Sequence, residues 1–421
     1  MATWGNLPII LSLTFMRYNR ESEKSRKGLK LVKFLHTSDW HIGRTLNGWS
    51  LLEEQKHAFK IMLAAAKQEK VDGIIIAGDL YDRTVPSAAA VTTFNEMLRE
   101  MNIQENFPIY AISGNHDGAR RLNYGREWME FNHLHLNTLL EEAFVPIETA
   151  EIQMFLLPYF DPADARVYFL QAGMPEEEVK EIKTLSQALE LVLEKMREAF
   201  HPEKKQILVT HFAVSPSADQ EIELTSETKS KAGGLATVTV QQFVDFDYVA
   251  LGHIHTHHAS PSETVRYSGS PVKFNIKEAK TKKGYYIVNV ADKVETEFFE
   301  IQPQTDLVAL AEEWETLIDP EFYQQRPLES AWFAICIKNF DRFAHAGQNL
   351  RAQLQKIYGT IVELDYEDKE RIIEHETHQN MEMMSEEEIV QNFYQQVAGE
   401  VLSPFQRTFI EETFIDLRGE K

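Results

Sequence analysis

Five polar clusters constrain the fold of this chain more than any other feature, because each begins where a short apolar segment ends. Short apolar segments that alternate with amphipathic stretches predict the strands and helices of an α/β core. Since α/β sheets place their sites at the carboxyl ends of strands, we expect one sheet edge to gather the clusters. In chain order they are Asp39-Trp40-His41, Gly78-Asp79-Leu80-Tyr81-Asp82, Gly114-Asn115-His116-Asp117, Thr210-His211 and Gly252-His253-Ile254-His255.

The α/β core is expected to span residues 32–301. Helices are predicted where apolar residues recur at helical spacing, as at residues 94–101. A hairpin-like pair of strands, 285–290 and 294–301, is expected to close the domain. The strands that lead into the five clusters are predicted at residues 32–35, 73–77, 109–112, 207–209 and 248–251.

Composition narrows the class of protein. With 421 residues, 43% of them hydrophobic, the chain can bury a large core, and its length indicates two or three domains. The single cysteine, Cys336, excludes intrachain disulfides and thiolate metal clusters, and it favours a cytoplasmic protein. No apolar run is long enough for a transmembrane helix. The net charge of −22 disfavours binding of nucleic acid over the whole surface, so any such contact must be local.

Two further units follow the core. Residues 302–377 predict a small α+β domain with a helix at 307–317, a strand at 331–338, a helix that Gly359 stops, and a strand at 360–366. This unit carries no catalytic constellation. Residues 385–421 predict two helices, because Ser385 with Glu388 and Ser403 with Gln406 are two capping-box starts.

Residues 1–31 precede the first core strand and are predicted to be an N-terminal extension. Their mixed run of charges at residues 17–30 is unlike the compact start of such a fold. Residues 26–28, Arg-Lys-Gly, could be encoded by a purine-rich ribosome-binding site. We therefore expect a mis-called translation start, with Leu31 or Val32 as the true initiator.

Taken together, the five clusters supply carboxylates, imidazoles and one amide, without cysteine. That ligand set suits a pair of divalent ions such as Mn²⁺. Hydrolysis of a phosphodiester near neutral pH requires ions that neutralise the phosphate, generate hydroxide and align the reacting groups. Two ions about 3.5 to 4 Å apart can share these tasks through a bridging carboxylate and a bridging hydroxide.

The order of the clusters resembles the motif series of the calcineurin-like metallophosphoesterases. Within that superfamily, residues 36–43, His-Thr-Ser-Asp-Trp-His-Ile-Gly, are similar to the SbcD family of exonuclease subunits. The loop with residues 233–235, the stretch 267–271, the small domain and the helical tail share this resemblance. It implies a β-sandwich flanked by helices, a capping domain at 302–377, and a C-terminal helical pair.

The same resemblance implies a role for each site residue. Asp39, His41 and His255 would hold one ion, Asn115, His211 and His253 the other, and Asp79 would bridge them. His116 would contact the scissile phosphate or protonate the leaving oxygen, with Asp117 orienting its imidazole. Asp82 sits where some relatives carry a histidine, and the alternative interpretation is a loop carboxylate or a helix-start residue before Pro86.

The resemblance also implies partners and an activity. The chain would be a Mn²⁺-dependent nuclease, with Mg²⁺ as the alternative ion, that forms a homodimer within a heterotetramer with an SbcC-type ATPase. The C-terminal helices would bind that ATPase. The activities implied are ATP-dependent 3′→5′ exonuclease on double-stranded DNA and endonuclease on single strands, in DNA repair, recombination and replication. Two alternatives stay open, namely another phosphodiesterase or phosphatase and a non-catalytic scaffold of the same fold.

Overall fold

The structure is a computed structural model that describes residues 30–217, 237–342, 344–368, 389–391, 393–395 and 401–418. Apart from Lys30 and Leu31, the predicted N-terminal extension therefore lies outside the described residues. The loop at residues 233–235 and the capping box at Ser385 lie outside them as well.

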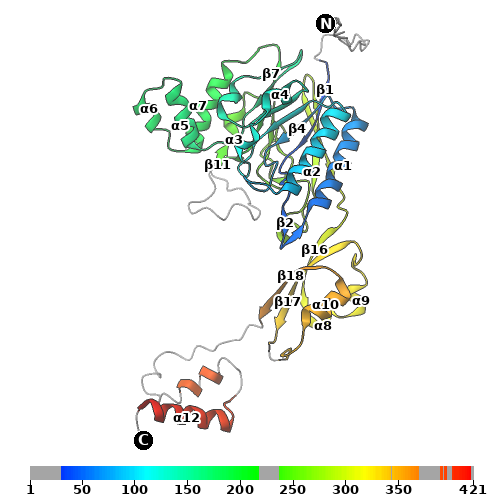
Figure 1. The fold of residues 1–421 in the computed structure, drawn as a ribbon, viewed down its shortest axis with the longest axis vertical. Helices are drawn as coiled ribbons and strands as arrows, with labels where there is room; N and C mark the ends of the chain where they lie inside the picture. The colour runs from blue at the N-terminus through cyan, green and yellow to red at the C-terminus, as the bar shows by residue number, and fades with distance from the viewer. Residues whose placement is uncertain are drawn as a thin grey trace, which may run out of the picture.

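The first domain is built on two facing sheets (Figure 1). The six-stranded sheet has the order β15-β14-β1-β4-β5-β6, and the five-stranded sheet has the order β13-β12-β9-β8-β7. The first sheet comprises β1 (Val32–Thr37), β4 (Gly73–Ala77), β5 (Ile109–Ile112), β6 (Leu134–Asn137), β14 (Gly284–Val290) and β15 (Val294–Glu300). The second comprises β7 (Ile147–Glu148), β8 (Ile152–Leu156), β9 (Lys205–Thr210), β12 (Tyr248–Leu251) and β13 (Val265–Tyr267).

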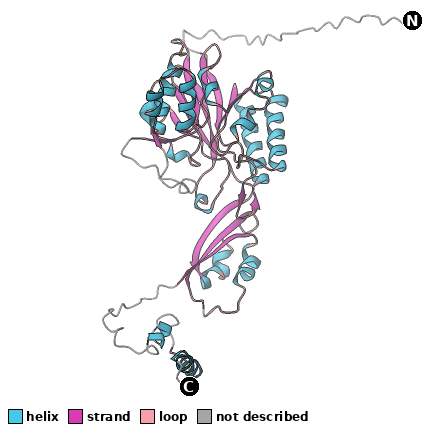
Figure 2. Ribbon diagram, turned by 60° about the vertical axis from the view of Figure 1, so that its left-hand side comes forward, coloured by secondary structure: helices cyan, strands magenta, loops and turns pink. Residues whose placement is uncertain are grey.

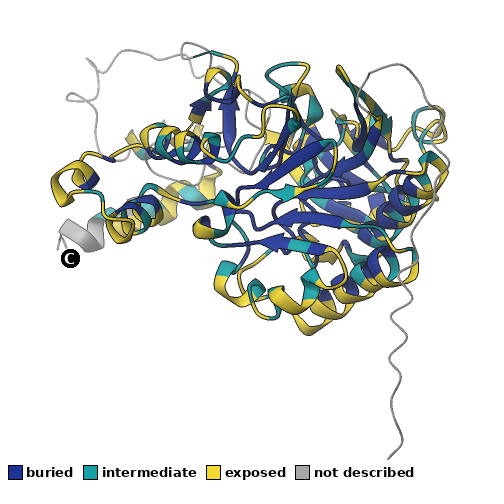
Figure 3. Cartoon of the chain, turned by 90° about the horizontal axis from the view of Figure 1, so that it is seen from above, coloured by how far each residue is buried: buried dark blue, intermediate teal, exposed yellow. Residues whose placement is uncertain are grey.

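The main core lies between these two sheets. Phe34, Ile75 and Ile112 of the first sheet pack with Met154 and Val209 of the second, and all five are buried. The central strands are apolar on both faces, as expected for strands covered on each side. Figure 3 shows them as a buried interior surrounded by exposed helices.

Helices cover the outer face of each sheet (Figure 2). On the first sheet, α1 (Leu52–Glu69) and α2 (Ala88–Leu98) pack through apolar residues such as Phe59. On the second sheet, α5 (Pro162–Gln171) and α7 (Leu185–Arg197) form a separate core. The resulting four layers, helix, sheet, sheet and helix, confirm the predicted helix-flanked sandwich.

The topology brings the carboxyl ends of five strands to one edge. In the first sheet, β4 pairs in parallel with both β1 and β5. In the second, β9 and β12 pair in parallel. Each of the five clusters follows one of these strands, so the cores that bury the strands also position the polar side chains.

The small domain is a three-stranded parallel sheet in the order β16-β17-β18. Helices α8 (Trp314–Leu317), α9 (Pro320–Tyr323) and α10 (Leu350–Tyr358) connect the strands and pack with them in one core. The strands are β16 (Asp306–Glu313), β17 (Ala331–Phe340) and β18 (Ile361–Asp368).

The helix predicted at residues 307–317 is wrong. That segment is strand β16 as far as Glu313, and only the turn α8 that follows is helical. Leu307 packs in the core that α1 shares, whereas Leu310 packs in the core of the small domain. A short run that is apolar on both faces cannot be distinguished from a helix by periodicity alone.

A hairpin and one buried carboxylate join the two domains. The hairpin of β2 (Thr45–Leu46) and β3 (Trp49–Ser50) reaches the small domain, where the side-chain amide of Asn47 donates to Glu363 at 2.8 Å. The carboxylate of Glu54 in α1 accepts hydrogen bonds from the amides of Gln304 and Thr305, at 3.1 and 2.9 Å. These contacts fix the start of the small domain.

The second helix of the tail is α12 (Pro404–Arg418). It begins as predicted, because the Ser403 amide donates to the Gln406 side chain at 2.9 Å and the Gln406 amide donates to the Ser403 hydroxyl at 3.3 Å. The side chain of Gln406 also donates to the hydroxyl of Tyr394 in the preceding helical segment, at 3.2 Å. None of the helices in the described ranges combines the length and apolar composition that a membrane span needs.

We expect Glu54→Ala to loosen the junction between the domains while the first domain stays folded. A hydrogen bond to a charged group contributes about 1.5–3 kcal/mol, so exchange at the amides of Gln304 and Thr305 should accelerate about tenfold or more. Hydrogen exchange followed by mass spectrometry measures this. Glu53→Ala is the matched control, because Glu53 is exposed on the same helix and pairs only with Lys56 among the contacts described. Equal exchange in the two variants would refute the role of Glu54.

Candidate metal centre

All seven predicted ligands meet at the edge where the five strands end. Asp39, His41 and His211 are completely buried, and Asp79 and His255 are 2% exposed. The set consists of Asp39 and His41 after β1, Asp79 after β4, Asn115 after β5, His211 after β9, and His253 and His255 after β12. The seven residues thus form one cluster, and their role as metal ligands stays a prediction.

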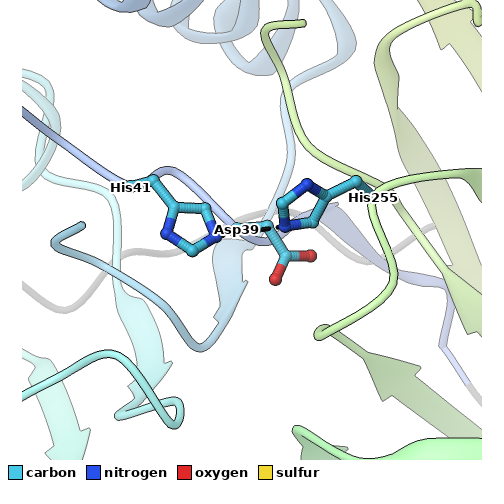
Figure 4. Close-up of side chains that lie close together, drawn as sticks. All are labelled: Asp39, His41 and His255. Carbon is cyan, nitrogen blue, oxygen red and sulfur yellow. Dashed lines mark hydrogen bonds between the residues drawn. The ribbon is translucent and has the colours of Figure 1, made fainter. Parts of the chain in front are cut away.

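One part of the cluster surrounds His41. Its Nε2 lies 3.1 Å from Nε2 of His255 and 3.4 Å from Oδ2 of Asp79. Figure 4 shows the rings of His41 and His255 converging beside the carboxylate of Asp39. One ligand atom from each of these three side chains lies within 4.8 Å of the others.

The other part surrounds His211. Its Nε2 lies 3.2 Å from Oδ1 of Asn115 and 3.2 Å from Oδ2 of Asp79. The same oxygen of Asn115 lies 2.9 Å from Nδ1 of His253. One oxygen of Asp79, Oδ2, thus contacts a ring from each part of the cluster.

These spacings fit shared metal ions. Two donor atoms bound at about 2.1 Å to one ion, with a right angle between the bonds, lie about 3.0 Å apart. The donor pairs described above are separated by 2.9 to 3.4 Å. Two carboxylates, four imidazoles and one amide are a mixed oxygen and nitrogen set that suits a divalent ion such as Mn²⁺. The residues present therefore fit a divalent metal ion.

Several ligands occupy backbone conformations that non-glycine residues rarely adopt. Asp39, His41, Asp79 and His253 have φ values of 52°, 42°, 50° and 94°. Such conformations cost about 1–3 kcal/mol each and cluster at functional sites. These four residues lie in the loops directly after β1, β4 and β12.

Glycines next to the ligands are required by close packing. A Cβ on Gly114 would collide with the carboxylate of Asp79, and a Cβ on Gly252 would collide with the carbonyl of Ala77. A Cβ on Gly78 would meet the ring of His211, and the φ of Gly78 is +86°. The three clusters that begin with glycine do so because a ligand side chain or a strand carbonyl lies too close for a Cβ.

Burial and the carboxylates set the charge of the rings. Burial lowers the pKa of His211, but the neighbouring Asp79 carboxylate, aided by a hydrogen bond and by Asp39, raises that pKa to about 9. Burial, with the charge of His211, lowers the pKa of His253 to about 3. Burial also places the pKa of His41 well below its ordinary value. Of these three rings, His211 is therefore the one that carries a proton near neutral pH in the metal-free protein.

His116 lies beside the cluster with its ring held by the main chain. Its amide donates to Oδ1 of Asp79 at 2.9 Å, and its ring centroid lies 4.7 Å from that of His41. Its Nδ1 lies 3.0 Å from the carbonyl oxygen of Asp82. Because a carbonyl only accepts, Nδ1 carries the proton in this contact.

Asp117 differs from the expectation. Its carboxylate accepts hydrogen bonds from the amides of Leu80, Tyr81 and Gly114, at 3.0, 2.9 and 2.9 Å. The group at Nδ1 of His116 is instead the carbonyl of Asp82. Asp117 thus holds the loop that carries Asp79.

The carboxylate of Asp82 accepts hydrogen bonds from Arg44 at 3.1 Å and from Arg83 at 3.2 Å. One of its oxygens also lies within 4.8 Å of ligand atoms of His41 and His116. Asp82 is therefore placed at the rim of the cluster, where both its main chain and its side chain face site residues.

The sequence prediction missed the residues that support the ligands. The hydroxyl of Ser38 donates to Oδ2 of Asp39 at 2.6 Å. The buried carboxylate of Glu278 lies 3.3 Å from Nδ1 of His255. A serine next to a ligand could have been suspected, but Glu278 is 23 residues away from His255 and follows no local motif.

Comparisons with known proteins agree with this geometry. The calcineurin-like phosphoesterase family matches residues 32–257, which contain all five clusters. A protein named as the D component of the nuclease SbcCD, from Staphylococcus epidermidis, is 31% identical over 382 residues, covering 89% of this chain and 96% of the relative. One of the same name from Staphylococcus saprophyticus is 30% identical over 392 residues, covering 92% and 99%.

Metal binding near neutral pH should release a proton. His211 holds a proton below a pKa of about 9, and an imidazole must be neutral to bind a metal, so Mn²⁺ must displace that proton. The apparent affinity should therefore rise with pH until about pH 9 and fall as the medium becomes acidic. Titration calorimetry in buffers of different ionisation enthalpy measures the release. Binding heats that do not depend on the buffer would contradict this charge assignment.

Proposed function

The chain belongs to the calcineurin-like phosphoesterase family, and from that premise we propose that it is a DNA nuclease subunit with a two-metal centre. The observation that carries the proposal is the position of Asp79. Its Oδ2 lies 3.4 Å from the ring nitrogen of His41 and 3.2 Å from that of His211. A carboxylate between two sets of ligands is the arrangement that a bridged pair of ions requires.

Each ion would have its own ligands. Asp39, His41 and His255 would hold one ion, and Asn115, His211 and His253 would hold the other. Two ions bridged by Asp79 would neutralise the phosphate, acidify a water molecule and align the reacting groups. Two carboxylates do not cancel the charge of two divalent ions, so the site would attract a phosphodiester.

His116 would act on the substrate. Because its Nδ1 is engaged with the carbonyl of Asp82, Nε2 is the atom that would contact the scissile phosphate or protonate the leaving oxygen. Asp117 would serve this step indirectly, since its carboxylate accepts hydrogen bonds from the amide of Tyr81, in the loop with Asp79, and from that of Gly114, next to Asn115.

The protein would work in a complex. The names of the two staphylococcal relatives support an assembly with an SbcC-type ATPase. We assign to that complex ATP-dependent 3′→5′ exonuclease on double-stranded DNA and endonuclease on single strands, with Mn²⁺ as the ion. DNA repair, recombination and replication are the processes that need these activities. The single cysteine fits the reducing cytoplasm.

An exposed aromatic patch supports a homodimer. Tyr124, Trp128 and Phe131, on and beside α4 (Arg126–Glu130), are 80%, 69% and 83% exposed. Exposed patches of large apolar side chains often mark interaction sites. A second copy of the chain is the occupant that we propose.

The tail would bind the ATPase. Phe393, Phe405 and Phe409 are 64%, 82% and 63% exposed, so these apolar side chains of the helical pair are not covered in this chain. An amphipathic helix that docks its apolar side on partner helices is a common recognition mode.

His116→Ala should separate metal binding from chemistry. The variant should retain two bound ions per chain, and its turnover should fall by about 10²- to 10⁴-fold, the usual contribution of a general acid or base. Digestion of labelled duplex and hairpin DNA with Mn²⁺ and the partner ATPase, together with elemental analysis, measures both. His258→Ala is the control, because His258 is exposed close to the ligand His255. Full turnover in His116→Ala, or loss of its metals, would refute the role.

Removing residues 385–421 should abolish partner binding and leave the metal site intact. Cleavage of single-stranded DNA with Mn²⁺ should persist, while co-purification with the ATPase and ATP-stimulated duplex digestion should disappear. Phe409→Glu should weaken co-purification in the same way, and Thr408→Glu on the same helix is the matched control. A truncated chain that still co-purifies at full strength would overturn the assignment. Aggregation would instead indicate that the tail folds back on the small domain.

A further inference from the structure

A buried ion pair lies directly behind the metal ligand His255. Glu278 is completely buried and Lys283 is 4% exposed, and their charged groups are 2.7 Å apart. The two residues sit in the segment that leads from η6 (Ile276–Glu278) to β14. Neither belongs to the predicted ligand set.

Glu278 contacts the edge of the His255 ring that is turned away from the cluster. Its Oε1 lies 3.3 Å from Nδ1 of His255, while Nε2 on the other side of the ring lies 3.1 Å from His41. A carboxylate at Nδ1 favours the tautomer that carries its proton there, and this leaves the Nε2 lone pair for a metal.

Lys283 holds both Glu278 and the main chain of His255. Its ammonium donates to the carbonyl of His255 at 2.8 Å and to the hydroxyl of Ser270 at 2.8 Å. With Glu278 as the third acceptor, each of its three N–H groups has a partner. Gly269 packs against the same carbonyl, since a Cβ at this position would lie 2.9 Å from the carbonyl oxygen of His255.

Glu278 is itself held rigidly. Its Oε2 accepts a hydrogen bond from the amide of Phe274 at 3.0 Å, and its Oε1 accepts one from the side chain of Asn275 at 2.5 Å. Burying two charges carries a desolvation penalty that packed apolar side chains would avoid. The pair is therefore better explained by what it does to His255 than by stability.

We infer that Glu278, anchored by Lys283, is a positioning residue that fixes the ring of His255 with Nδ1 protonated and Nε2 turned toward the metal centre. The inference deepens the proposed two-metal function and rests on it. The segment before β14 would therefore support the ion site of Asp39, His41 and His255. It would not support the second ion site.

The test compares the full-length chain with two variants and one control. Glu278→Gln removes the negative charge and leaves the buried Lys283 without an anionic partner. The second variant, Glu278→Gln/Lys283→Met, therefore removes both charges. Lys282→Met is the control, because Lys282 is the adjacent lysine but its pair with Glu300 is exposed. Mn²⁺ affinity at each site is measured by chelator competition, and folding by the melting temperature.

Both Glu278 variants should bind Mn²⁺ about 10- to 100-fold more weakly at the His255 site, the usual effect of losing such a supporting group. The other site and Lys282→Met should keep wild-type affinity. A double variant with the wild-type melting temperature and wild-type affinity at both sites would overturn the inference. Wild-type protein that binds no Mn²⁺ would instead overturn the two-metal function.

Nitrogen NMR of the metal-free wild-type chain provides a readout that does not depend on the variants folding. The chemical shifts of the His255 ring should identify the tautomer with the proton on Nδ1. A ring with its proton on Nε2 would refute the positioning role, whatever the variants do.

Discussion

The contact between the His211 ring and the carbonyl of Ala77 orients the centre, because it joins the ends of strands in two different sheets. Ala77 is the last residue of β4, and His211 follows β9. The 2.8 Å contact at Nδ1 turns Nε2 toward Asp79 and Asn115. The core between the two sheets thus fixes how far the ligands after β4 lie from the ligands after β9.

The centre is costly without an ion. Two carboxylates and several rings are buried together, and four ligand residues have positive φ values. Both features reduce the stability of the fold. A bound ion would compensate for them, because it would neutralise the carboxylates and bind one nitrogen of each ligand ring, so we expect metal binding to be coupled to folding.

The sequence was sufficient for the features that follow local rules. Apolar segments that end in polar residues predicted the strands and the edge where the five clusters meet, whereas the sandwich and the set of seven ligands were implied by the resemblance to the metallophosphoesterases. The sequence also predicted the Ser403 capping box. It failed for β16, because the two buried residues of this strand, Leu307 and Leu310, are three positions apart, a spacing that also fits a helix.

Other features depend on distant contacts that no local pattern encodes. The carbonyl of Asp82 at His116 and the pair of Glu278 with Lys283 exist only once the chain is folded. The carboxylate of Asp117 was expected at His116 but binds three amides, because a buried acceptor is satisfied by the nearest donors.

Electron paramagnetic resonance of the Mn²⁺-loaded chain can show whether two ions share a bridge. Two ions that share the Asp79 carboxylate and a bridging oxygen are coupled magnetically, so we predict two Mn²⁺ per chain with the spectrum of an interacting pair. A spectrum of isolated Mn²⁺ at saturation, with one ion per chain, would contradict the two-metal centre.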